Sequence, residues 1–177
     1  CGICPVTCYA EPSAGSSVFD TDGNGALDTY NLYQNSGSVT ARITNSDGVD
    51  IGDEGDYLLA YVGEELRGVA DAYEVGDELG NGYAFLTLVY SNAASGEVVN
   101  FKFYDSSEGL IQNIDVGTSC PDNNGTPGIQ DGESDLCSSN GSISFVSDMI
   151  VGNLVSAWTG SLCSDPEILT VCGDGTC

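Results

Sequence analysis

Residues 57–90, YLLAYVGEELRGVADAYEVGDELGNGYAFLTLVY, decide the fold class. They hold three apolar runs, at 57–62, 66–73 and 83–90, which are apolar at successive positions rather than at alternate ones. This pattern is typical of central strands that are covered on both faces. The Gly, Asp and Asn residues at 76–82 are typical of a turn. The stretch therefore predicts consecutive antiparallel strands.

Half-buried strands are predicted on either side of this stretch. In SVTARI, residues 38–43, Val39, Ala41 and Ile43 alternate with polar residues, and VNFKF at 99–103 alternates in the same way. Later candidate strands are 108–114, 142–150 and 167–172, whereas 148–158 could instead form one short helix. Strands about ten residues apart, with few helix signals, predict an all-β fold, an antiparallel β-sandwich of the immunoglobulin-like or jelly-roll-like type with disulfide-stapled terminal segments.

The chain divides into three zones of one domain. At 177 residues and 18.3 kDa it has the size of a single domain with a sizeable core. Residues 1–36 form a cysteine-containing arm that runs into an acidic loop, and 37–115 form the predicted sandwich core. Residues 116–177 are a cysteine-rich segment that we expect to complete or extend the sandwich.

Four short motifs in the core zone occur in a characteristic order: Val62-Gly63-Glu64, Arg67-Gly68-Val69-Ala70, Gly96-Glu97 and Phe101-Lys102-Phe103. With them, residues 37–114 resemble a β-sandwich module of large secreted and cell-surface proteins of bacteria. The resemblance implies an extracellular, non-catalytic building block, and it brings no catalytic residues with it. The cysteine-rich ends depart from that module.

The charge balance restricts the partners. The chain has 27 acidic and 3 basic residues and a formal charge of −24. Three scattered bases cannot form a phosphate-binding patch, which excludes nucleic acid and argues against anionic lipid surfaces. No apolar stretch approaches the ~20 residues needed to span a bilayer, so no membrane insertion is expected. Self-repulsion of this size favours bound cations.

Eight cysteines lie in the two ends of the chain: Cys1, Cys4, Cys8, Cys120, Cys137, Cys163, Cys172 and Cys177. The spacings do not form matched zinc-binding pairs and the chain has no histidine, so disulfides are favoured over the alternative of a zinc cluster. Their pairing cannot be deduced from the sequence. Disulfides place the protein outside the cytoplasm, as an extracellular or cell-surface protein.

DTDGNGALD, residues 20–28, resembles the calcium loop of EF-hand and dockerin proteins. The resemblance implies a metal site with oxygen ligands from Asp20, Asp22, Asn24, the carbonyl of Ala26 and Asp28. The twelfth position is Asn31 instead of a bidentate acid, so we expect the loop without the usual helix pair and with another carboxylate completing the site. Calcium is preferred, because the ligands are flexible oxygens without nitrogen or sulfur. The alternative is a solvated turn in which Asp and Asn cap their own backbone amides.

Further candidate sites are less specific. A second metal site could form between Cys120 and Cys137, from Asp122, Asn124, Asp131, Glu133 and Asp135. The acids at Asp47, Asp50, Asp53 and Asp56 are interpreted as an exposed acidic turn. Asn124 and Asn140 are N-glycosylation acceptors by sequence.

Two functions remain open. Without histidine the chain cannot build the usual nucleophile–histidine systems, and we expect that it is not an enzyme. The first hypothesis is an extracellular structural protein, a calcium-stabilised subunit that binds copies of itself in a filament or surface assembly. The subunits would be joined by donation of the N-terminal arm or of residues 166–171 into a neighbour's sheet. The alternative is a secreted, calcium-dependent adhesion module with a carbohydrate or other surface ligand.

Overall fold

The computed structural model describes residues 9–118, 120–121, 136–162 and 167–168. Within these residues there is no α-helix, which confirms the predicted all-β class. Short 3-10 helices occur at Ser16–Val18 (η1), Tyr30–Leu32 (η2) and Asp77–Leu79 (η3). The strands are β1 (Tyr9–Pro12), β2 (Asn35–Thr44), β3 (Tyr57–Val62), β4 (Glu65–Glu74), β5 (Tyr83–Ser91), β6 (Ser95–Asp105), β7 (Leu110–Gly117), β8 (Ile143–Val146), β9 (Ile150–Val151), β10 (Trp158–Leu162) and β11 (Glu167–Ile168).

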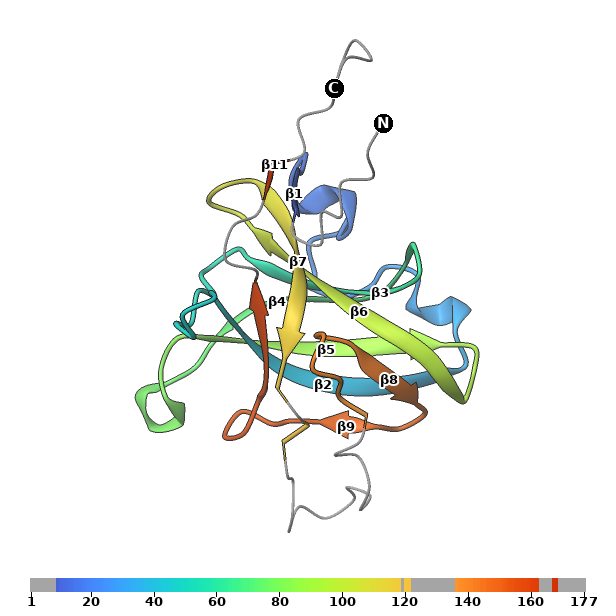
Figure 1. Ribbon diagram of the computed structural model, residues 1–177. Coiled ribbons are helices and arrows are strands. Elements are labelled where there is room, and N and C mark those ends of the chain that lie inside the picture. The colour runs from blue at the N-terminus through green and yellow to red at the C-terminus, as the bar shows by residue number, and fades with distance from the viewer. Residues whose placement is uncertain (1–8, 119, 122–135, 163–166, 169–177) are drawn as a thin grey trace, which may run out of the picture.

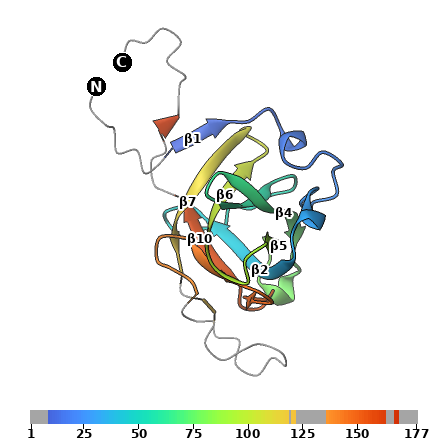
Figure 2. The same cartoon turned by 90° about the vertical axis from the view of Figure 1, so that its right-hand side faces the viewer.

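Seven of these strands close into a barrel, in the order β7-β10-β2-β5-β4-β3-β6 and back to β7. Figure 2 shows them arranged around a common interior, with β1 outside. The antiparallel β6–β7 pairing, from Lys102↔Asn113 to Asp105↔Leu110, closes the ring. The predicted two-sheet sandwich is therefore not confirmed. Alternating burial is the same for a strand in a sandwich and a strand in a barrel, so the sequence pattern could not distinguish them.

The strands outside the ring pair with three of its members, β7, β6 and β2 (Figure 1). β1 pairs antiparallel with the first half of β7, and β11 pairs parallel with β1 through Tyr9↔Glu167 and Ala10↔Ile168. β8 pairs antiparallel with the first part of β6, and β9 pairs parallel with β2. Within the described residues, both segments proposed for strand donation therefore contribute a strand that pairs inside its own chain.

The barrel interior is filled by large apolar side chains. The rings of Phe85 and Phe103 meet edge to face with centroids 5.9 Å apart, and those of Phe101 and Trp158 are 5.2 Å apart. Each of these four side chains is at most 1% exposed. The indole Nε1 of Trp158 donates to the carbonyl of Thr118 at 3.1 Å, which satisfies the one polar atom of that ring.

A second, smaller apolar cluster covers the outside of the barrel. Phe19, Leu27, Leu59, Val69 and Tyr104 are all buried in it. The segment before β2 thus covers β3 and β4, which explains why their sequences are apolar on both faces. For β5 the same prediction is wrong, because Leu86 and Leu88 are 49% and 48% exposed.

The alternative of a helix at 148–158 is also wrong. The segment contains β9, a turn and the start of β10. Gly152 has a φ of 73°, outside the helical region, and a Cβ there would lie 2.7 Å from the carbonyl oxygen of Thr40. The side chain of Asn153 then accepts hydrogen bonds from the amides of Val155 and Ser156 at 2.9 Å, which forms the turn.

The prediction of disulfides is confirmed for one pair, which the sequence could not specify. Cys120 and Cys137 are bonded, with Cα atoms 5.1 Å apart, and Cys120 is buried in the barrel core. Cys1, Cys4, Cys8, Cys163, Cys172 and Cys177 lie outside the described residues.

Candidate functional site

The acidic loop 20–28 lies against the outer cluster and is anchored at both ends. Phe19 packs edge to face on the rings of Tyr57 and Tyr104, each with centroids 5.2 Å away. Leu27 is 4% exposed. Phe19, directly before the loop, and Leu27, directly before Asp28, therefore hold the polar residues between them at the barrel surface.

Asp20 is the buried acid of this loop, with 3% of the residue exposed. Its Oδ1 accepts hydrogen bonds from the amides of Gly23 at 2.9 Å and Asn24 at 3.1 Å, and its Oδ2 accepts from the amide of Gly25 at 2.9 Å. Three consecutive amides therefore point at one carboxylate. This turn requires φ values of 70° and 72° at the two glycines, which glycine adopts without strain.

The other polar side chains of the loop also accept hydrogen bonds from the loop's own amides. Asp22 Oδ1 accepts from the amide of Asn24 at 3.3 Å, and Asn24 Oδ1 accepts from the amide of Ala26 at 2.9 Å. Asp28 Oδ2 accepts from the amide of Thr21 at 3.2 Å and from its hydroxyl. These are the self-capping bonds of the alternative interpretation, so the protein's own amides give the loop its shape.

Three carboxylates of the loop also converge on one another. Asp20, Asp22 and Asp28 each offer an oxygen, and these oxygens lie within 4.8 Å of one another. Amide capping does not require this convergence, because each cap uses an oxygen independently. An all-oxygen, negatively charged set of this kind is the ligand type of a hard cation such as Ca²⁺ or Mg²⁺.

A fourth carboxylate reaches the loop from β4. A Cβ added at Gly25 would lie 2.5 Å from Cγ of Asp71, so the Asp71 carboxylate lies directly against the loop backbone. The sequence predicted an additional acid from elsewhere in the fold, and Asp71 is the candidate for it; its part in a metal site stays a prediction. Burial, and next the negative charge of Asp20, raise the pKa of the neighbouring Tyr57 hydroxyl.

The flanks of the loop are single 3-10 turns, η1 before it and η2 after it, in place of a helix pair. Asn31 lies within η2. The loop is thus supported by the barrel surface instead of by two packed helices.

The structure does not test the second candidate metal site. Asp122, Asn124, Asp131, Glu133 and Asp135 lie outside the described residues.

The acidic turn at 47–56 is exposed at Asp47, Asp50 and Asp53, as predicted, but Asp56 is only 2% exposed. Asp56 accepts from the amide of Asp53 at 2.8 Å and from the amide and hydroxyl of Ser106 at 2.9 and 3.1 Å. Burial raises the pKa of Asp56 in spite of these bonds. It links two loops and is not part of the candidate metal site.

All three basic side chains are paired with acids. Arg42 contacts Asp50 at 2.7 Å, and Lys102 Nζ lies 3.9 Å from an oxygen of Glu11.

Arg67, whose side chain is 9% exposed, contacts both Glu65 at 3.0 Å and Glu97 at 3.3 Å and lies over the ring of Tyr33. This network joins two of the sequence motifs, the one at 67–70 and the one at 96–97. The pairing itself was not predicted.

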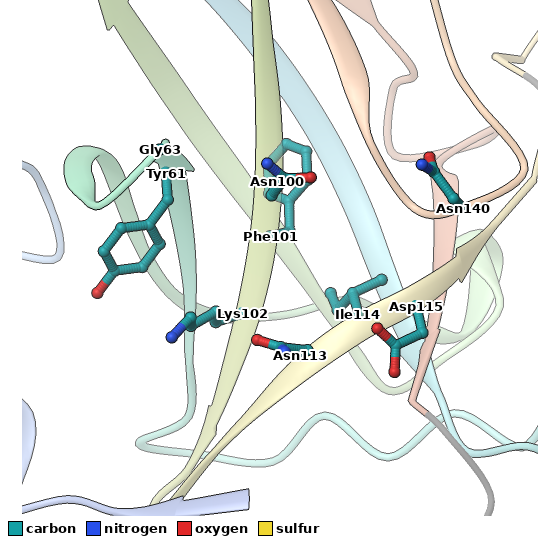
Figure 3. A pocket seen from close by; sticks show the side chains of 9 residues that line it. All are labelled: Tyr61, Gly63, Asn100, Phe101, Lys102, Asn113, Ile114, Asp115 and Asn140. Carbon is teal, nitrogen blue, oxygen red and sulfur yellow. The ribbon is translucent and has the colours of Figure 1, made fainter. Parts of the chain in front are cut away.

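A polar cleft that the sequence analysis missed opens beside the β6–β7 pair (Figure 3). It has a volume of about 520 Å³, and among its lining side chains are Tyr61, Asn100, Lys102, Asn113 and Asp115. In the sequence Asn100 and Lys102 are outward positions of an alternating strand, and nothing marks the other three residues as parts of one site.

Asn140, one of the two sequon asparagines, also lines this cleft (Figure 3). It is exposed, and its Oδ1 accepts from the amide and hydroxyl of Ser142 at 3.2 and 2.7 Å. The acceptor side chain of the sequon is thus at the surface, in a turn. Whether a glycan is attached stays a prediction.

Comparison with protein-family models, with curated proteins and with solved structures finds no match to this chain. In the part of the chain that the structure describes, no helix has the length and apolar character to cross a membrane.

Proposed function

We propose that the protein is an extracellular, non-catalytic structural domain in which a calcium ion bound by the loop 20–28 is held against the barrel. The observation that carries this proposal is the convergence of the Asp20, Asp22 and Asp28 oxygens on a loop anchored by Phe19 and Leu27. Extracellular calcium is abundant, and weak sites with several carboxylates suit it. The buried disulfide Cys120–Cys137 supports an oxidising location.

The charge of the chain supports the same proposal. Each base among the described residues already has an acidic partner, so the remaining acids have no basic side chain left to offset them. The loop brings three carboxylates together at one place on the surface, and a fourth, that of Asp71, lies against the loop backbone at Gly25. A divalent ion there lowers the repulsion where it is greatest. The absence of histidine from the sequence supports a non-catalytic role.

Isothermal titration calorimetry with CaCl₂ and with MgCl₂ tests the ion. We expect one saturable Ca²⁺ site, weaker Mg²⁺ binding, and loss of the site in Asp22→Asn. Asp47→Asn is the matched control, because it removes the same charge from an exposed turn outside the loop. Ca²⁺ binding that Asp22→Asn leaves unchanged would contradict the placement of the ion in this loop.

The finer proposal is a subunit that binds copies of itself in a filament or surface assembly. It is supported by the outer strands β1 and β11, which lie outside the closed ring and are short. Because both pair within their own chain, exchange between copies requires release of β1 from β7 and its replacement by the same strand of a neighbour. Light scattering and electron microscopy in Ca²⁺ and in EGTA test this, and a monomer at all concentrations in both conditions would exclude it.

A further inference from the structure

The polar cleft exists because two paired strands separate. β6 and β7 are paired only from Lys102↔Asn113 onward. Before that point β6 pairs with β8 at Val99↔Ile143, and beyond it β7 pairs with β10 at Ile114↔Leu162. The turn that carries Asn140 comes close to β7, because the amide of Gly117 donates to the carbonyl of Ser139 at 3.2 Å. The cleft is therefore part of the barrel architecture.

The side chains around the cleft offer both donors and acceptors. Figure 3 shows Asn100 and Lys102 on β6, Asn113 and Asp115 on β7, and Asn140 on the facing turn. The carboxamides of Asn100 and Asn113 can each donate and accept, and that of Asn140 can donate, because its Oδ1 already accepts from Ser142. The ammonium only donates and the carboxylate accepts. Tyr61 adds an aromatic ring beside Lys102, whose Nζ lies 5.4 Å from the ring centroid. This mixture suits a ligand that also has donors and acceptors at neighbouring atoms.

Asp115 supplies the second observation. Its Oδ2 is buried and has no hydrogen-bond partner within the described residues. Such an acceptor is stabilised when a donor is supplied, by water or by a ligand. Burial also raises the pKa of the Asp115 carboxyl. None of the ion pairs among the described residues includes Asp115.

We propose that this cleft binds a neutral saccharide, with Asp115 and the three asparagines as its hydrogen-bonding residues and Tyr61 as an apolar face. Each sugar hydroxyl donates one hydrogen bond and accepts others, so it can satisfy the Asp115 oxygen and a neighbouring carboxamide together. Anionic ligands are disfavoured by Asp115 and by the −24 charge of the chain. A primary amine could also satisfy Asp115, but it has no acceptor for the carboxamides.

The test is an array of neutral hexose and N-acetylhexosamine oligosaccharides, followed by calorimetric titration with the saccharides bound. The protein is produced in a bacterial host, because a glycan on Asn140 would compete for the cleft. The variants are Asp115→Asn and Asn113→Ala, with Asp47→Asn as the charge-matched control outside the cleft. Butylamine is titrated as the competing ligand class. Binding is measured in EGTA as well, because no residue of the loop 20–28 lines the cleft.

We expect saturable binding to at least one array saccharide, unchanged in EGTA and in Asp47→Asn. Asp115→Asn should weaken it by about tenfold, because a neutral acceptor replaces a charged one, and Asn113→Ala should also weaken it. Circular dichroism checks that the variants are folded. The proposal is overturned if the folded wild-type protein binds no array saccharide, if both cleft variants bind as wild type does, or if butylamine binds and no saccharide does.

Discussion

Two substitutions in the acidic loop distinguish the carboxylate that holds the loop's shape from one that binds the proposed ion. Asp20→Ala removes the carboxylate that accepts from the amides of Gly23, Asn24 and Gly25. At about 1 kcal/mol net for each hydrogen bond, the free energy of unfolding should fall by about 3 kcal/mol, even in EGTA. Asp22→Ala removes an exposed side chain that, within the described part of the chain, accepts hydrogen bonds from Asn24 alone, so in EGTA it should change stability by less than about 0.5 kcal/mol.

In saturating Ca²⁺, unlike in EGTA, Asp22 should contribute to the free energy of unfolding. At a Ca²⁺ concentration 100 times the dissociation constant, a bound ion stabilises the folded protein by about 2.7 kcal/mol. Wild-type protein should show such a gain between EGTA and saturating Ca²⁺, and Asp22→Ala should show little of it. Urea unfolding followed by tyrosine and tryptophan fluorescence measures both quantities.

The expectations for Asp20→Ala and for Asp22→Ala can be refuted separately. An Asp20→Ala protein that loses less than about 1 kcal/mol in EGTA would mean that the three amides do not depend on this carboxylate. An Asp22→Ala protein that keeps the whole calcium-dependent gain would mean that the ion binds elsewhere.

Three further outcomes are expected. Burial raises the folded-state pKa of Asp115, so its protonated form stabilises the fold below the ordinary carboxyl pKa, and this contribution is lost as pH rises through the folded pKa. Asp115→Asn should therefore unfold at a higher urea concentration than wild type at pH 7. The difference should vanish below about pH 4. Replacing both Cys120 and Cys137 by Ser should lower stability by about 3 kcal/mol, measured in urea, for a loop closed across a separation of 17 residues. Gly25→Ala should lower the melting temperature more than Gly48→Ala. Both glycines have a positive φ, which destabilises an alanine by about 1 kcal/mol at either position, but only Gly25 faces a carboxylate. Equal melting temperatures of the two variants would contradict this.

The strands could be predicted from the sequence because their periodicity is local. Val39, Ala41 and Ile43 alternate along β2 and all point into the core, and the bounds of β3 agree with the predicted run. Closure of the ring is not local. It depends on which strands β7 meets, and the sequence of residues 110–117 is compatible with either a free edge or a closed barrel.

The candidate sites, too, could be predicted only where their residues are close in sequence. The loop 20–28 could be identified because its ligands follow one another in sequence, whereas Asp71 reaches it only through the packing of β4. The cleft combines side chains from three strands and a turn, and each is an unremarkable outward residue in its own segment. Asp115 in particular looks solvated in sequence, yet one of its oxygens is buried.

The position of β10 has a consequence for synthesis of the chain. Residues 158–162 lie between β2 and β7, which were made about 120 and about 40 residues earlier. At about 5–20 residues per second, β2 therefore waits on the order of 6 to 24 s for its parallel partner to leave the ribosome. Until then one side of β2 and of β7 offers unpaired backbone groups to other nascent chains. Folding yield in the producing cell should thus depend on what shields those two edges during that interval, more than on the stability of the finished barrel.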